Sequence, residues 1–142
     1  MPNLEIRLPH GRIDAAARRS LAERLTSDLL AAEGLPDNDT TRALTWVTIE
    51  ESSPGAWSIA AQPAEERAEL HAFARITTFA SLLDDEKRAA LLRAVNTAIV
   101  DAAGGDPLGG LGVWTVLEEI PDGHWGVAGN PIGKEELRLV NA

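Results

Sequence analysis

An internal repeat is the feature that most constrains the fold of this chain of 142 residues. Trp46 and Trp57 stand 11 residues apart, and two further tryptophans repeat that spacing 68 residues later. When residues 46–63 are aligned with residues 114–131, seven of the 18 positions are identical. Unrelated segments of average composition would share about one. The sequence therefore predicts two copies of one structural unit.

Two helical segments extend the repeat upstream. Residues 14–33 and 84–103 align at an offset of 70, and each begins with an Asp in a position to cap the helix N-terminus. Each segment carries large aliphatic residues at intervals of four, which is typical of a helix with one buried face. Gly34 and Gly104 follow the two segments and supply the left-handed residue that often ends a helix.

A short strand candidate precedes each helix, at residues 3–8 and 70–77. At an offset of 68 these strands pair Arg7 with Arg75. This alignment makes the strand–helix loop of the second unit longer by two residues and its helix–strand loop shorter by two. A helical crossover between two strands favours a parallel β-α-β unit with a right-handed connection.

The predicted fold is α/β, with two fused β-α-β units in the order β-α-β-β-α-β and a pseudo-twofold repeat. We expect a single domain over residues 1–142, built from repeats at residues 2–63 and 70–132 and followed by a tail at 133–142. Each unit ends in a hairpin-like segment around Pro-Gly or Asp-Gly. A ferredoxin-like split β-α-β fold has the same element order. It predicts antiparallel neighbours for the first strand, whereas two β-α-β units predict a parallel pair.

Charge and composition narrow the classes of partner. The net charge of −9 argues against nucleic acid or an anionic membrane. The absence of Cys excludes thiolate zinc sites and Cys nucleophiles. No apolar run is long enough to span a bilayer, and the first residues do not resemble a signal peptide. We therefore expect a cytoplasmic protein that uses no cofactor and no metal.

The chain begins Met1-Pro2. Removal of Met1 would leave Pro2 with a free secondary amine. An α-amino group titrates near neutrality, and burial beside cations lowers its pKa further, so the neutral amine can serve as a general base. A frayed terminus without function is the alternative interpretation of this feature taken alone.

Three motifs resemble the tautomerase superfamily, whose prototype is 4-oxalocrotonate tautomerase. They are Pro2 after the initiator Met, Gly11-Arg12 between the first strand and the helix, and the run Gly123-His-Trp-Gly-Val-Ala-Gly129. Residues 55–61 are a weaker copy of the last motif. The resemblance covers nearly the whole chain. It implies a fused, double-length member, similar to cis-3-chloroacrylic acid dehalogenase and malonate semialdehyde decarboxylase, that assembles as a homotrimer.

The resemblance also implies a site. Pro2 would be the general base in keto–enol tautomerisation of a small carboxylate, with Arg12 and Arg75 as substrate-binding residues. Trp125 would help to exclude water from the substrate. Asp39 lies in a segment that resembles the loop carrying the decarboxylase's acidic residue, and would handle water or a proton.

Alternatives remain open for these residues. Arg12 could pair with a helix carboxylate, Arg75 could be an exposed strand arginine, Asp39 could cap a turn, and Trp125 could anchor a core or an interface. The position opposite Pro2 in the second repeat holds Leu70 at an offset of 68, and its nitrogen is acylated, so we expect one catalytic site per chain.

Two other functions compete with tautomerisation. In a hydratase, dehalogenase or decarboxylase of a three-carbon acid, Pro2 would act as a protonated general acid. A non-catalytic protein with the same fold is the second alternative. Trp46 and Trp114 stand where the prototype has an arginine, which indicates a different mode of substrate recognition.

Overall fold

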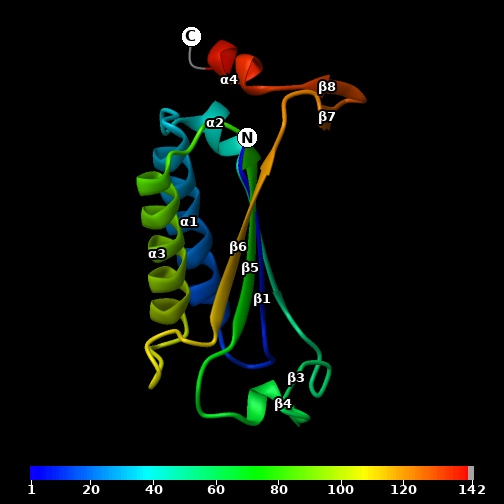
Figure 1. Ribbon diagram of the computed structural model, residues 1–142. Helices are drawn as coiled ribbons and strands as arrows, with labels where there is room; N and C mark the ends of the chain where they lie inside the picture. Colours follow the sequence, from blue (N-terminus) through cyan, green and yellow to red (C-terminus); the bar gives the residue numbers. More distant parts are fainter. Residues whose placement is uncertain (141–142) are drawn as a thin grey trace.

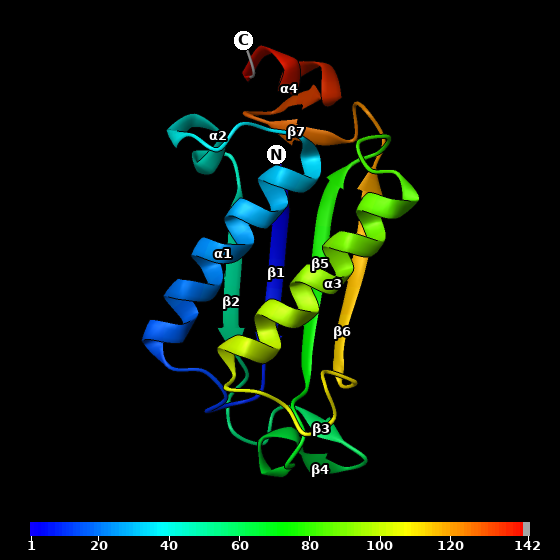
Figure 2. The same cartoon turned by 90° about the vertical axis from the view of Figure 1, so that its left-hand side faces the viewer.

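Two long helices lie side by side on one face of a four-stranded sheet, as Figures 1 and 2 show. The computed structural model describes residues 1–140. The helices are α1 (Ala15–Glu33) and α3 (Asp85–Ala102). The strands are β1 (Asn3–Leu8), β2 (Trp46–Glu51), β5 (Ala72–Phe79) and β6 (Val113–Ile120). Within residues 1–140, no helix covers the other face of this sheet.

The strand order is β2-β1-β5-β6, which confirms two adjacent β-α-β units. β1 pairs with β2 in parallel, and β5 pairs with β6 in parallel. The two units meet through an antiparallel pairing of β1 with β5. In the ferredoxin-like alternative, another strand separates the two strands of each β-α-β unit. Because β1 pairs directly with β2 in parallel, that alternative is excluded.

The two repeats align at a constant offset of 70 from the first strand through the helix. Asn3 lies beside Trp46, and Phe73 lies beside Trp114, so Phe73 is the structural equivalent of Asn3. The loops after these strands match as well, because Gly11 (φ 77°) and Ser81 (φ 69°) occupy the same left-handed position. The prediction of a longer strand–helix loop in the second repeat is therefore wrong. Only the helix–strand loop differs.

This register also corrects the predicted pairing of Arg7 with Arg75. Arg75 is the equivalent of Glu5 and lies directly opposite it in the β1–β5 pair, on the pseudo-twofold axis. β5 begins at Ala72, two residues later than predicted. A strand has a side-chain period of two, so offsets of 68 and 70 give the same alternation of buried and exposed residues. The hydrophobic pattern alone does not distinguish them.

Both helices begin as predicted, and α1 also ends as predicted. Asp14 accepts a hydrogen bond from the Ala17 amide at 2.7 Å, and Asp84 accepts one from the Lys87 amide at 2.8 Å. Gly34 (φ 71°) ends α1. In α3 the cap residue is Ala103, and Gly104 (φ 83°) follows it.

The core lies between the helices and the sheet. It contains aliphatic stripes from both helices and the inward-facing residues of the two central strands. These include Leu21, Leu25 and Leu29 of α1, Leu91, Val95 and Ile99 of α3, Leu4, Ile6 and Leu8 of β1, and Ala74 and Ile76 of β5. Because the apolar residues converge on one face, the helix-free face of the sheet keeps the polar and aromatic residues.

Short elements complete each repeat. Hairpins β3 (Ser58–Ile59) with β4 (Gln62–Pro63), and β7 (Trp125–Val127) with β8 (Asn130–Ile132), lie at opposite ends of the sheet (Figure 1). Their two-residue turns, at residues 60–61 and 128–129, have positive φ throughout, as type I′ turns require. The Pro-Gly and Asp-Gly pairs form earlier turns instead.

The remaining elements are α2 (Asp39–Ala43), the 3-10 turn η1 (Ala64–Glu66) and α4 (Lys134–Val140). Among the helices of residues 1–140, none is both long enough and apolar enough to cross a membrane.

Candidate active site at the N-terminus

Pro2 is buried at the start of β1. Its carbonyl oxygen accepts a hydrogen bond of 3.1 Å from the Trp46 amide at the start of β2. The terminus is therefore part of the sheet and is not frayed. With Met1 present, the Pro2 nitrogen is a tertiary amide, and the free ammonium belongs to Met1.

Glu33 is a residue of this site that the sequence analysis missed. Its side chain is only 2% exposed, and Oε2 lies 3.2 Å from the Met1 nitrogen. The other carboxylate oxygen accepts a hydrogen bond from the Thr78 hydroxyl on β5. A sequence signal existed, because an acidic residue in the last turn of a helix is disfavoured by the helix dipole and needs another reason to be there.

Two opposing effects act on the N-terminal amine. Burial lowers the pKa of the Met1 amine below its ordinary value, because the fold removes water from the charged form. The Coulombic attraction and the hydrogen bond of Glu33 raise the pKa, and burial outweighs them. The amine at this place is thus shifted toward its neutral form.

Trp125 lies at the same end of the sheet as Pro2. Its ring packs against Phe79, with centroids 5.2 Å apart and planes inclined at 43°. Phe79 is fully buried at the end of β5, whose last residues run beside the start of β1. Trp125 is half-buried, so it forms part of the wall at this end.

Asp39 lies in α2, which is at the same end of the molecule as the N-terminus (Figures 1 and 2). It is exposed, and the helix cap is Asn38, whose side chain accepts a hydrogen bond of 3.0 Å from the Thr41 amide. Asp39 therefore does not cap this turn.

Arg12 lies at the other end of β1 from Pro2. Its guanidinium donates to the backbone carbonyl oxygens of Arg67 and Glu69, the latter at 3.2 Å, in the segment between the repeats. Its Nε is buried without a hydrogen-bond partner among residues 1–140. Within one chain Arg12 supports this connection, and a substrate contact by Arg12 stays a prediction that requires a second copy.

Arg75 projects from the middle of the helix-free face, midway between the two ends of the sheet. Its Nε lies 3.4 Å from Oε1 of Glu118, and its guanidinium carbon lies 5.9 Å from the centre of the Phe73 ring. The side chain is 47% exposed. Of the two predicted substrate arginines, Arg75 is the one whose cation remains accessible on this face.

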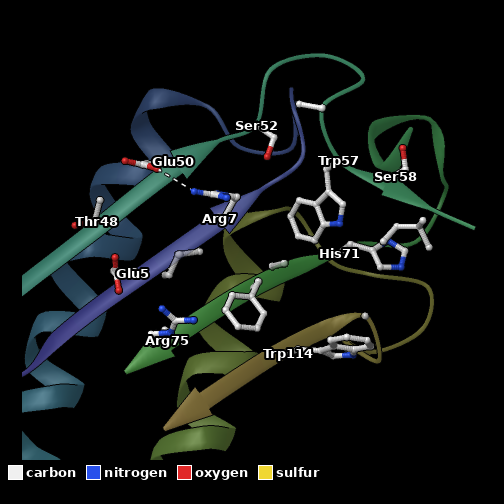
Figure 3. Close-up of a pocket in the computed structure, with 16 residues that line it drawn as sticks. Glu5, Arg7, Thr48, Glu50, Ser52, Trp57, Ser58, His71, Arg75 and Trp114 are labelled. Carbon is white, nitrogen blue, oxygen red and sulfur yellow. Dashed lines mark ion pairs between the residues drawn. The ribbon is translucent and has the colours of Figure 1, made fainter. Parts of the chain in front are cut away.

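A cavity of about 700 Å³ opens on the same face at the end opposite Pro2 (Figure 3). Arg7, Trp57, His71 and Trp114 surround it, and Arg75 lies at its edge. Pro2 does not line this cavity.

The geometry agrees with known proteins. The model of the tautomerase enzyme family matches residues 73–135, from β5 through β8 into α4. The second repeat therefore resembles the tautomerase enzyme family in sequence. A search of curated proteins finds no match.

Solved structures with this fold match almost the entire chain. A fused 4-OT described as a wild-type symmetric trimer is 24% identical (TM-score 0.71, covering 90% of this chain and 93% of that chain). Pt0534, solved after inactivation by 2-oxo-3-pentynoate, is 20% identical (TM-score 0.75, covering 94% and 98%). A member of the cis-3-chloroacrylic acid dehalogenase family, N1, is 22% identical (TM-score 0.73, covering 99% and 92%). The predicted tautomerase-like fold of two fused β-α-β units is therefore confirmed.

Proposed function

We propose that this protein is a tautomerase in which Pro2, freed by removal of Met1, is the general base for keto–enol tautomerisation of a small carboxylate. The observation that carries the proposal is the place of Pro2, buried at the start of a central strand with the chain terminus held inside the fold. The match of residues 73–135 to the tautomerase enzyme family supports it.

The proposed reaction moves one proton. The neutral Pro2 amine takes the proton from the enol hydroxyl, the electron pair of the O–H bond forms the carbonyl, and the C=C pair becomes available at carbon. The Pro2 ammonium then returns the proton to that carbon. Arg75 would hold the substrate carboxylate through its planar pair of N–H donors, and Trp125 would limit access of water.

Glu33 is the proposed positioning residue for this amine. Its carboxylate is fixed by Thr78 and faces the place of the terminus. It would stabilise the Pro2 ammonium that forms when the proton is taken up. Burial favours the neutral amine and Glu33 favours the cation, so the two effects together set the pKa of the base.

The test is ketonisation of phenylenolpyruvate and 2-hydroxymuconate by the native chain and by Pro2→Ala. Pro2→Ala leaves a primary amine at the terminus without the ring that fixes its position, and it is expected to lower kcat/KM by about 10²-fold. Arg75→Gln should raise KM. Arg24→Gln is the matched control, because Arg24 makes an exposed ion pair with Asp101 on the helical face. Equal rates for the native chain and Pro2→Ala would show that the secondary amine of Pro2 is not required for the reaction.

The pH profile gives a second test of the same base. Activity that depends on the neutral amine rises with pH through the pKa of Pro2 and is constant above it. Glu33→Gln removes a carboxylate that raises this pKa, so the rising limb should move to lower pH. An unmoved limb would show that Glu33 does not act on the amine.

The buried carboxylate beside the terminus favours one alternative function. Glu33 stabilises a cation, and a protonated Pro2 could act as general acid in hydration, dehalogenation or decarboxylation of a three-carbon acid, with Asp39 handling water. The fold likeness to N1 makes this chemistry the natural second candidate. Activity that falls as pH rises through the pKa of Pro2 would favour it. An intact Met1 and no turnover would favour a non-catalytic protein.

The proposed assembly is a homotrimer. Trp46 is 69% exposed on the outer strand β2, which is unusual for tryptophan in an isolated subunit. The fused 4-OT that shares this fold is described as a symmetric trimer. Sedimentation equilibrium should give three times the chain mass, and the mass of one chain would contradict the proposal.

A further inference from the structure

The cavity at the far end of the sheet is the pseudo-symmetric counterpart of the Pro2 site. The offset of 70 that relates the strands places Ala72 where the first repeat has Pro2. The offset of 68 that relates the tails places Trp57 where the second repeat has Trp125. The cavity volume of about 700 Å³ is in the range of small-molecule sites. The second repeat has therefore kept the shape of a site.

This counterpart has no base at its centre. The Ala72 nitrogen is an acylated backbone amide, and it donates a hydrogen bond of 3.1 Å to the Gly112 carbonyl. It has neither a free electron pair nor a freely titrating proton. A ligand in this cavity would be held without being converted by the chemistry proposed for Pro2.

Aromatic side chains form the walls. Trp57, Phe73 and Trp114 line the cavity from the loop before β3 and from strands β5 and β6. Figure 3 shows the rings of Trp57 and Trp114 on different sides of the opening. Flat aromatic surfaces in a concave site favour a ligand that carries a planar ring.

Two guanidinium groups supply the polar contacts. Arg7 lies opposite Phe73 in the β1–β5 pair, so Arg7 and Arg75 are diagonal neighbours on the same exposed face. Arg7 is 64% exposed, and its nearest carboxylate oxygen, on Glu50, is 3.8 Å away. Such a long, exposed ion pair is weak, and a ligand carboxylate with two oxygens in plane can replace it.

His71 forms a further part of the wall. Its Nδ1 is buried and has no hydrogen-bond partner among residues 1–140. The ring lines the cavity beside Trp114 (Figure 3). Because this nitrogen has almost no accessible surface, His71 contributes other atoms of its ring to the cavity wall.

We propose that this cavity is a non-catalytic binding site for a small aryl carboxylate. The ring lies between Trp57 and Trp114, and the carboxylate is bound by Arg7 with Arg75. Glu5 and Glu50 also line the cavity, so its charges nearly cancel and recognition depends on the planar fit at the guanidinium groups. The site does not depend on the amine of Pro2, although it shares Arg75 with the carboxylate contact of the proposed reaction.

Calorimetric titration of the full chain tests the site with ring-matched probes. The probes are 3-phenylpropionate, 3-phenylpropan-1-ol and phenethylamine, which share the ring and differ in the charge of the head group. We expect saturable binding of the carboxylate, and affinity at least about tenfold lower for the alcohol and the amine, as loss of a charge-assisted hydrogen bond implies.

Matched variants place the ligand. Arg7→Gln and Trp57→Ala should each weaken this binding event by about tenfold. Trp125→Ala changes the equivalent wall at the Pro2 end and should leave the event in place. Arg7 is exposed, so Arg7→Gln tests the site without a cost in folding, and thermal unfolding checks that Trp57→Ala is folded.

Three results would overturn the proposal. They are no saturable binding of 3-phenylpropionate, equal binding of the amine, and binding that is lost in Trp125→Ala but kept in Trp57→Ala. The last result would move the ligand to the Pro2 site. Because binding is read without turnover, failure of the ketonisation assay does not affect this test.

Discussion

Replacement of Arg12 by methionine separates a structural role from a role in substrate binding. Methionine keeps an unbranched apolar side chain but removes the guanidinium, which donates to the carbonyl oxygens of Arg67 and Glu69. Hydrogen bonds to charged groups contribute roughly 1.5–3 kcal/mol each. The carbonyls are only partly buried, and water can replace some of this interaction. The expected loss is therefore about 2 kcal/mol of the free energy of unfolding for the pair.

This loss is measurable by thermal unfolding. For a domain of this size, 1 kcal/mol corresponds to roughly 3–4 °C in Tm, so Arg12→Met should lower Tm by about 7 °C. Circular dichroism and tryptophan fluorescence should report the same transition at matched protein concentration, because assembly makes Tm depend on concentration. Arg24→Met is the control, and its exposed ion pair should change Tm by less than about 2 °C.

The opposite pattern would refute the structural role. An unchanged Tm for Arg12→Met, together with a large rise in KM for the enol substrate, would show that the guanidinium serves the substrate. Arg12→Lys should be measured together with Arg12→Met. Lysine restores the charge without the planar pair of donors, so it should recover only part of the stability.

Three further predictions concern the core, a helix end and the terminus. Leu25→Ala, at a fully buried position, should cost about 2–5 kcal/mol in urea unfolding, and a smaller loss would mean that the site collapses around alanine. Gly34→Ala should cost about 1 kcal/mol, because nothing lies within 4 Å of the added Cβ and only the positive φ of 71° opposes it. In the chain that retains Met1, burial lowers the pKa of the folded amine, and Glu33 opposes this in part. The unfolded chain therefore binds this proton more tightly than the folded chain. The free energy of unfolding should rise with pH until the pH reaches the pKa of the amine in the unfolded chain, about 8. Acetylation of the amine should remove that slope, and an identical slope after acetylation would contradict the assignment.

Most of the fold could be predicted because several local signals agree. The two Asp caps, the aliphatic stripes and Gly34 define the helices, and the repeated tryptophans show that the same unit occurs twice. The exact register could not be predicted. The left-handed position that Gly11 marks in the first repeat is held by Ser81 in the second, so no glycine reveals the equivalence.

The candidate site could be predicted only in part from the sequence. Pro2 is identified by its position in the sequence, and Trp125 by a motif. Glu33 was missed because it reads as the last residue of an ordinary helix, and only the folded chain brings it to the terminus and to Thr78. Arg12 has the right residue type and spacing, yet within one chain it contacts the segment between the repeats. Sequence spacing does not report which end of a strand a side chain serves.

The most direct test of the central claim compares turnover with the state of the N-terminus. Intact-protein mass spectrometry measures the fraction of chains that lack Met1, and ketonisation of phenylenolpyruvate is measured on the same samples. If Pro2 is the base, kcat per chain is proportional to the fraction that begins at Pro2, and chains that retain Met1 are inactive. Equal turnover by chains that retain Met1 would contradict the claim.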